Sequence, residues 1–208
     1  MNSDQILVDG HEAEREKKIY LMMNKPRGLV TTASDEKGRE TIYSVLAGSG
    51  ESLPWVAPVG RLDKASEGLL LLTNDSEWGA LVAAPETHLE KTYHVQIATI
   101  ESDRVIAAML RGISIDGQIL TAKQCRLLRS GEKNCWLEIA LDEGKNRQIR
   151  RMLAGLGVEV LRLLRVSIGP LRLGALAKGT YRSLSAEEKS TLDRAMKKPS
   201  NSVRGGAC

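Results

Sequence analysis

A run of four leucines, Leu69–Leu72, constrains the fold more than any other stretch of this chain. The run follows a polar loop, Val59–Gly68, and is ended by Asn74–Asp75. A short continuous apolar run with such borders predicts a β-strand that is buried on both faces. A loop that leads into such a strand lies at the edge of a rigid core, where functional groups are commonly placed. The simplest interpretation of the loop is a turn with a surface ion pair, and the stretch alone does not exclude it.

Composition indicates an ordinary globular protein with a moderate basic excess. The chain has 208 residues, a length that allows one large domain or two small ones. Of these residues 42% are hydrophobic and 27% are charged, which is the ordinary globular range. The net charge is +4, and there is no Phe beside three Trp and four Tyr. A nucleic-acid binder with a broad stacking platform needs more aromatic side chains than this. If the chain binds RNA, we therefore expect Lys and Arg to supply most of the affinity.

The cysteine spacing and the N-terminal composition indicate the cellular compartment of the protein. Cys125, Cys135 and Cys208 have neither paired nor metal-like spacing, which predicts free thiols in a reducing cytoplasm. Residues 1–18 are polar and charged, without the apolar segment of a targeting signal. No apolar run approaches the roughly 20 residues that span a bilayer. We expect a soluble, cytoplasmic protein with no membrane partner.

Local patterns predict a mixed architecture. Apolar runs and alternation predict strands over 6–8, 19–24, 69–72, 90–98, 135–141 and 158–168. Helical spacing and capping signals predict helices over 41–47, 75–84, 102–111, a segment ending at Gly157, and a last helix from Ser185. Asp116–Gly117 predicts a hairpin. We expect a largely antiparallel α+β sheet in a domain over 19–197, preceded by a solvated lead-in over 1–18 and followed by a disordered tail over 198–208.

A dense basic cluster lies at the start of the helix that ends at Gly157. Lys145, Arg147, Arg150 and Arg151 are expected in its first two turns. Cations there oppose the helix dipole at about 0.3–1 kcal/mol each, so stability does not explain them. A solvated surface, neutralised by Asp142 and Glu143, is the simpler alternative. The density of the cluster favours RNA binding, and Lys25, Arg27, Arg162 and Arg165 are candidates to extend it.

Asp63 and Tyr93 are the other candidates. A carboxylate at the edge of a core needs a cation or hydrogen-bond donors to stay charged, and an arginine of the basic helix is the expected partner of Asp63. Glu67 is expected to be a surface charge. Tyr93 is most simply a core aromatic on an alternating strand. The chain has no paired-carboxylate, Walker-type or metal-ligand pattern, and its three histidines are scattered.

Several segments, in order, resemble the motifs of ribosomal RNA pseudouridine synthases of the RsuA family. The first is Leu21–Gly28, and the signature motifs are Gly60–Asp63, Lys91–Tyr93 and Glu143–Met152. Arg165–Gly169 and Gly179–Leu184 resemble the closing segment. Any one of these motifs is weak, but together they are highly specific and cover about residues 19–190.

The resemblance implies the isomerisation of uridine to pseudouridine in RNA without a metal or organic cofactor. It implies the pseudouridine synthase fold, a mainly antiparallel mixed sheet flanked by helices with a central RNA-binding cleft. It also implies that Asp63 is the catalytic carboxylate, Arg150 its basic partner and Tyr93 the residue that packs on the target base. By the same resemblance, Arg61 is expected to fill the gap left by the flipped nucleotide. The wider set of expected RNA contacts is Arg61, Lys25, Arg27, Lys145, Arg147, Arg151 and Arg165.

The sequence says less about which RNA is the substrate than about the reaction. Many relatives begin with an S4-type RNA-binding domain, and here only Ile6–Gly10 resembles the tail of one. Either the chain is a member without that domain, which favours large-subunit 23S ribosomal RNA, or it is truncated. The same reaction on 16S RNA and a catalytically silent RNA-binding protein are the alternatives, while a hydrolase lacks a second placed carboxylate. We expect a monomer that acts on ribosomal RNA or a ribosome assembly intermediate.

Overall fold

The structure is a computed structural model, and it describes residues 7–8, 11–12, 17–32, 35–48, 50, 53–142 and 144–197. The expected tail over 198–208 and most of the expected lead-in lie outside these residues. Within the lead-in, β1 (Leu7–Val8) pairs antiparallel with β2 (His11–Glu12), so the predicted strand over 6–8 is confirmed for its described part.

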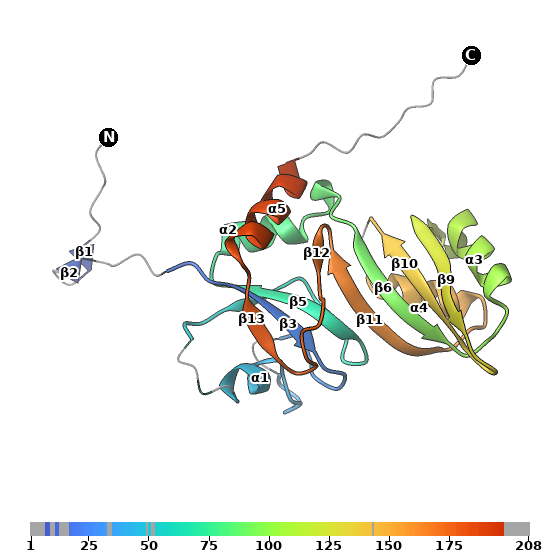
Figure 1. The fold of residues 1–208 in the computed structure, drawn as a ribbon, viewed down its shortest axis with the longest axis horizontal. Helices are drawn as coiled ribbons and strands as arrows, with labels where there is room; N and C mark the ends of the chain where they lie inside the picture. The colour runs from blue at the N-terminus through green and yellow to red at the C-terminus, as the bar shows by residue number, and fades with distance from the viewer. Residues whose placement is uncertain are drawn as a thin grey trace, which may run out of the picture.

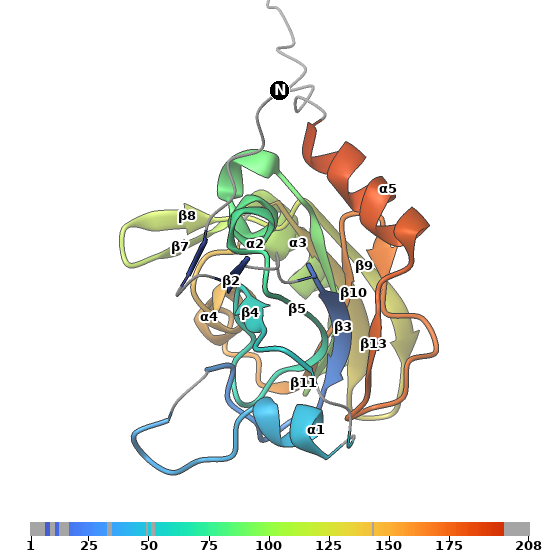
Figure 2. The same ribbon diagram turned by 90° about the vertical axis from the view of Figure 1, so that its left-hand side faces the viewer.

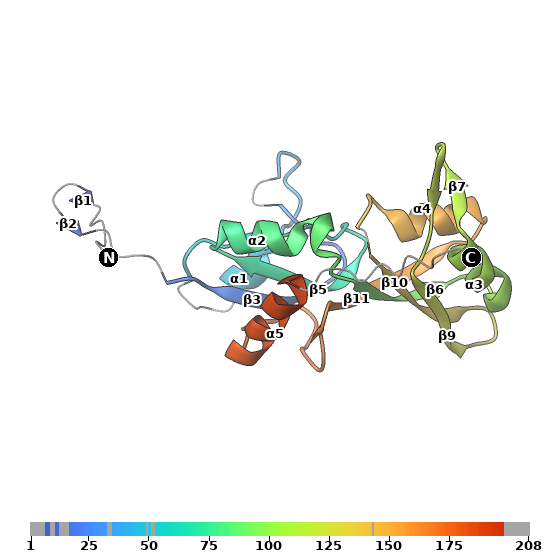
Figure 3. The same cartoon turned by 90° about the horizontal axis from the view of Figure 1, so that it is seen from above.

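A nine-stranded sheet dominates the described part of the chain, and it runs along the long axis of the molecule (Figure 3). Its order is β13-β3-β5-β11-β6-β10-β9, with β4 added beside β5 and β12 beside β11. The strands are β3 (Tyr20–Lys25), β4 (Ala57–Val59), β5 (Glu67–Thr73), β6 (Lys91–Ile97), β9 (Gln124–Ser130), β10 (Cys135–Leu141), β11 (Val160–Ile168), β12 (Leu171–Arg172) and β13 (Tyr181–Ser183). Its described pairings are antiparallel except β11 with β5, so the α+β expectation is confirmed.

Helices and a small hairpin complete the fold. The helices are α1 (Tyr43–Ala47), α2 (Ser76–Ala83), α3 (Ser102–Arg111), α4 (Gln148–Gly155) and α5 (Ala186–Lys197), with a 3₁₀ turn η1 at Pro85–Thr87. The hairpin joins β7 (Ile113–Ile115) to β8 (Gln118–Leu120) around the predicted Asp116–Gly117 turn. Around strands β3 and β5, helix α1 lies on one side, and helices α2 and α5 lie on the opposite side (Figures 1 and 2).

The leucine run is buried on both faces, as its sequence predicts. Leu69–Leu72 are all 0% exposed. Leu69 and Leu71 pack into a cluster with α2 and α5, whereas Leu70 and Leu72 pack into a cluster with α1. Because alternate side chains of a strand point to opposite faces, the two clusters hold β5 rigidly from both sides.

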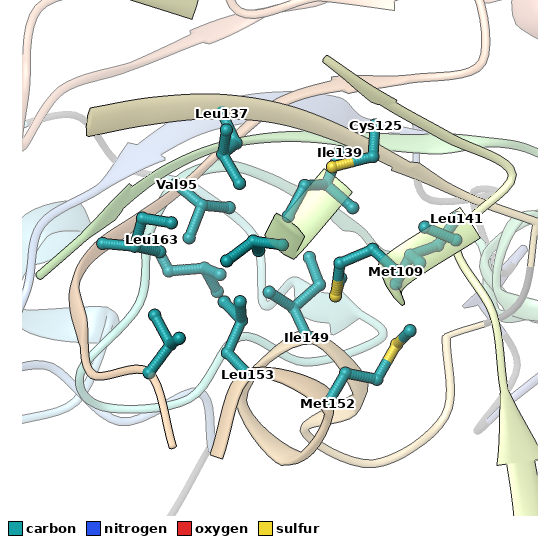
Figure 4. Packing of buried hydrophobic residues seen from close by; sticks show 14 of the residues in the cluster. Val95, Met109, Cys125, Leu137, Ile139, Leu141, Ile149, Met152, Leu153 and Leu163 are labelled. Atoms are coloured by element: carbon teal, nitrogen blue, oxygen red, sulfur yellow. The ribbon is translucent and has the colours of Figure 1, made fainter. Parts of the chain in front are cut away.

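The β6–β10 half has its own core, under α3 and α4. Met109 of α3 and Ile149, Met152 and Leu153 of α4 pack on strand residues that include Val95, Leu137 and Ile139 (Figure 4). The predicted apolar stripe of the helix ending at Gly157 is therefore confirmed. Strand β11 lies between the two halves and pairs with both β5 and β6 (Figure 1).

Two expectations are wrong. Glu67 is not a surface charge but 3% exposed, and its carboxylate lies 3.1 Å from Arg162 Nη2 and 2.8 Å from Lys178 Nζ, which keep it charged inside the protein. Helix α4 begins at Gln148, because Arg147 adopts a left-handed backbone with φ of 49°. Of the basic cluster, only Arg150 and Arg151 are thus inside the helix.

Candidate active site

The loop that carries Asp63 is fastened to the body of the protein. Gly60 makes the turn into it with a positive φ of 68°. Thr31 Oγ1 donates to the carbonyl oxygen of Leu62 at 2.8 Å, and the Ser66 amide donates to that of Asp63 at 2.9 Å. The buried Leu62 side chain anchors the loop next to Asp63. The Asp63 backbone is therefore fixed before any substrate binds.

Lys25 supplies the deepest support of this loop. Its side chain is 0% exposed, and Nζ donates to the carbonyl oxygens of Pro26, Asp63 and Ser66 at 3.1, 3.2 and 3.0 Å. Burial lowers the pKa of Lys25 to about 8, against the opposing charges of Glu67 and Asp63. The expectation that Lys25 contacts RNA is wrong in this structure, because its ammonium is enclosed by backbone carbonyls.

Two arginines face the Asp63 carboxylate. Arg147 Nη1 lies 3.0 Å from Asp63 Oδ2, and Arg150 Nε lies 4.0 Å from the same oxygen. Arg150 is the better buried of the two, and its Nη2 donates to the Ala65 carbonyl at 3.0 Å. Burial and the Arg147 charge lower the pKa of Arg150, and the Asp63 charge opposes that effect. An arginine partner for Asp63 is thus confirmed, but the closer one is Arg147.

A cavity of about 590 Å³ adjoins this ion pair. Its wall comes from the loop between β4 and β5, from β6 and β11, and from residues 144–150. Tyr93 lines the cavity and packs against the clusters of both halves of the sheet. This volume lies within the range of small-ligand pockets, roughly 300–1,000 Å³, and leaves room for a whole nucleotide.

Most of the predicted site residues meet in this cavity. Its lining includes Asp63, Tyr93, Arg150, Arg61, Lys145, Arg147 and Arg165. Two other predicted cations do not line it: Arg27 is exposed with Nη1 3.5 Å from the Leu161 carbonyl, and Arg151 Nη2 donates to Asp116 Oδ2 on the β7–β8 turn at 2.9 Å. The structure therefore brings together residues from the three signature motifs and from the closing segment.

The family profile described as RNA pseudouridylate synthase matches residues 19–155. The chain belongs to this family. It is 34% identical to the "Ribosomal large subunit pseudouridine synthase B" of Bacillus subtilis, over 91% of this chain and 78% of that protein. It is also 34% identical to an "Uncharacterized RNA pseudouridine synthase" of Aquifex aeolicus, over 93% and 77%. The resemblance to the RsuA-type ribosomal RNA pseudouridine synthases is confirmed.

Solved structures agree with the family assignment. A crystal structure of a pseudouridylate synthase matches with a TM-score of 0.69 and 34% identity, over 88% of this chain and 75% of that one. The archaeal box H/ACA Nop10–Cbf5 complex matches with a TM-score of 0.52 and 16% identity, over 74% and 49%, which is a likeness of fold alone. The predicted pseudouridine synthase fold is therefore confirmed.

Two lining residues of this pseudouridine synthase were missed as candidates. Lys91 lines the cavity beside Tyr93. Ser66 lines it too, and its buried hydroxyl has no hydrogen-bond partner among the described residues. The signal for Lys91 was present, because it shares the inward face of its strand with Tyr93, Val95 and Ile97. Lys91 is a charged residue on the otherwise apolar inward face of β6, and this exception to the alternation marks it as a candidate.

Among the residues that the structure describes, no group of three or more His, Cys, Asp or Glu side chains has the geometry of a metal site. No described helix is both long and apolar enough to cross a membrane. Cys125 and Cys135 are free and buried, as expected.

Proposed function

We propose that this chain isomerises one uridine of large-subunit 23S ribosomal RNA to pseudouridine, with Asp63 as the catalytic carboxylate. The observation that carries the proposal is the placement of Asp63 on a fastened loop, against a cavity with room for a nucleotide that Tyr93 and Arg150 also line. The identity to the Bacillus subtilis protein named for the large ribosomal subunit supports the choice of subunit.

The reaction rearranges bonds within one nucleotide. The N1–C1′ bond breaks, a C5–C1′ bond forms, C5 loses a proton and N1 gains one. Because substrate and product contain the same atoms, no oxidant or co-substrate is consumed. The enzyme has to expose the base, hold it while it turns, and manage the charge that develops, and we expect side chains alone to do this.

Asp63 and the two arginines that face it have different functions at the sugar of the target nucleotide. Asp63 is 32% exposed, so its carboxylate is accessible from the cavity. Arg150 is held by its bond to the Ala65 carbonyl, and its charge beside the Asp63 carboxylate orients that group. Arg147 is half-exposed and can leave Asp63 for an RNA phosphate, which would release the carboxylate for the substrate. The two arginines thus have different mobility and different roles.

The base must leave its stack before this chemistry can start. Extruding a nucleotide costs a few kcal/mol unless it already lies in a loop. Arg61 is exposed beside the cavity and can stack in the vacancy, which offsets part of that cost. Tyr93 offers a flat face to the lone uracil. Lys145, Arg147, Arg27 and Arg151 supply cations for the flanking phosphates.

We propose a monomeric enzyme that acts in the cytoplasm on ribosomal RNA or on an assembly intermediate. The proposed catalytic side chains all lie within one copy of the chain, so a monomer would suffice to form the site. The basic cluster beside the cavity supports a ribosomal RNA partner.

Tritium release from ribosomal RNA labelled at C5 of uridine tests the proposed function. The wild-type chain should release tritium from 23S RNA of a strain that lacks this gene, and mapping should locate one modified uridine. Release from 16S RNA alone would overturn the subunit choice. If the wild-type chain released tritium from neither RNA, whether the RNA was free or in assembly particles, the proposal that it is a ribosomal RNA pseudouridine synthase would be overturned.

A further inference from the structure

Two cations on the inward face of the sheet have no role in the site described so far. Arg165 is 5% exposed, and its Nε donates to the Leu69 carbonyl at 2.7 Å. Its Nη2 is buried and forms no hydrogen bond within the described residues. Lys91 is half-buried, and its Nζ makes no hydrogen bond or ion pair with any described residue. Both side chains line the cavity.

The strand register places these cations beside the proposed base-stacking residue. Arg165 is the direct partner of Tyr93 in the β11–β6 pairing, so the two share one face of the sheet. Lys91 shares that face because it precedes Tyr93 by two residues. The β11–β6 register also shifts between Arg165 and Ser167, and such bulges re-aim side chains near active sites.

The local charges leave Lys91 without a carboxylate of its own. Asp142 is the carboxylate that acts on Lys91, but its Oδ1 lies 2.9 Å from Lys123 Nζ. Burial lowers the pKa of Lys91, and the Arg165 charge lowers it further. A buried, unpaired donor costs roughly 1–3 kcal/mol, and more when it is charged. The buried, unpaired Arg165 Nη2 beside the half-buried, unpaired Lys91 is costly to the free protein and indicates that a ligand binds both cations.

We propose that Lys91 Nζ and Arg165 Nη2 bind a carbonyl oxygen of the target uracil and stabilise the anionic base. The inference rests on the proposed function. When the N1–C1′ bond breaks with its electron pair on the base, the negative charge spreads over the ring and the two carbonyl oxygens. Fixed cations in a site that excludes water stabilise such a charge more strongly than water does. They also hold the detached base while C5 turns toward C1′.

The kinetic test compares Lys91→Met with Lys133→Met, an exposed lysine in the β9–β10 turn. In single-turnover tritium release, Lys91→Met should lower the rate at saturating RNA by 10²-fold or more, which is the usual effect of removing one such donor. Lys91→Arg and Arg165→Lys should retain more activity than the methionine variant. The Lys133→Met rate should match the wild type.

The binding test separates a uracil oxygen from a backbone phosphate, which offers the same oxygen chemistry. Lys91→Met should leave the RNA dissociation constant and its salt dependence unchanged. A weaker complex with a flatter salt dependence would mean a phosphate contact and would overturn the uracil assignment.

Thermal unfolding separates a substrate-binding role from a structural one. Because Lys91 is an unpaired, half-buried charge in the free protein, Lys91→Met should unfold at the wild-type temperature or above it. A lower unfolding temperature with a proportional loss of activity would overturn the proposal, as would a rate equal to that of Lys133→Met. In these outcomes wild-type tritium release persists, whereas its absence would refute the proposed function itself.

Discussion

At the scale of single residues, burial decides what each cation near Asp63 does. Lys25 is enclosed and bonded to three carbonyl oxygens, so it supports the loop. Arg147 is half-exposed and pairs with Asp63 itself. Lys91 has no partner among the described residues, which leaves it for the substrate. The same side-chain chemistry thus serves as support, electrostatic partner and ligand site.

Replacing Lys25 with Met should change the pH dependence of stability. Burial gives Lys25 a pKa of about 8 in the folded state, against 10.5 as its ordinary value. Between these values the unfolded chain binds more protons than the folded chain, so the stability of the wild type should rise with pH. The difference in unfolding free energy between wild type and Lys25→Met should therefore shift in favour of the wild type from pH 8 to 10.

Urea unfolding at several pH values measures this difference, and Lys133→Met serves as the exposed-lysine control. Tritium release by Lys25→Met should also fall, because the carbonyls of Asp63 and Ser66 lose their donor. A free-energy difference that stays constant over the pH range would contradict the assigned burial of the ammonium.

Sequence could not predict this role of Lys25. Local sequence groups Lys25 with the candidate RNA contacts, because Lys25–Gly28 has the composition of a basic turn. Its burial depends on the Asp63 loop, 38 residues later in the chain, folding over it. Glu67 was misplaced for the same reason, since its partners Arg162 and Lys178 are distant in sequence.

At the scale of elements, local patterns predicted the structure where the pattern was long enough. The leucine run, the alternation around Tyr93 and the 102–111 helix all matched, because each pattern reports burial on a known face. The strands β4 and β13 were not predicted, because three residues carry no periodicity and their pairing with β5 and β3 is a long-range property. The start of α4 was misjudged because backbone strain at Arg147 has no local sequence signal.

Gly68 at the junction of β5 and β11 should tolerate no side chain. Its φ is 102°, and an added Cβ would lie 2.3 Å from the Arg165 carbonyl oxygen and 2.9 Å from the Arg165 nitrogen. Backbone strain and this overlap together should make Gly68→Ala less stable by about 2–5 kcal/mol. Thermal or urea unfolding measures the loss.

Gly157→Ala is the matched control for this substitution. Gly157 also has a positive φ, 69°, but an added Cβ would meet nothing within 4 Å. Its replacement should cost only backbone strain, about 1–2 kcal/mol. If both variants lost the same stability, the close approach of β5 and β11 would not be what requires the glycine.

At the scale of the whole molecule, the net charge is only +4, but several basic side chains gather around the cavity that holds Asp63. Arg61, Lys145, Arg147 and Arg150 come from two segments about 85 residues apart and line one cavity. The three catalytic candidates could be predicted from their motifs, because motif order carries the resemblance. Their meeting in one cavity, and the part of Lys91 in it, required the three-dimensional register.

The salt dependence of RNA binding should report this concentration of charge. If Arg147 and Arg151 each contact one phosphate, the Arg147→Ala/Arg151→Ala variant should lose roughly 1.4–1.8 from the slope of log affinity against log salt. Arg104→Ala on α3, where the side chain pairs with Glu101, should leave the slope unchanged. Filter binding at several salt concentrations measures both variants, and an unaltered slope in the double variant would show that RNA binds elsewhere.

Single-turnover tritium release by Asp63→Asn, with RNA binding measured in parallel, tests the central claim most directly. The substitution keeps the shape of the side chain and removes the charge that Arg147 and Arg150 face. We predict that release from 23S RNA is abolished while the dissociation constant stays within a few-fold of the wild type. Substantial release by Asp63→Asn would contradict the assignment of Asp63 as the catalytic carboxylate.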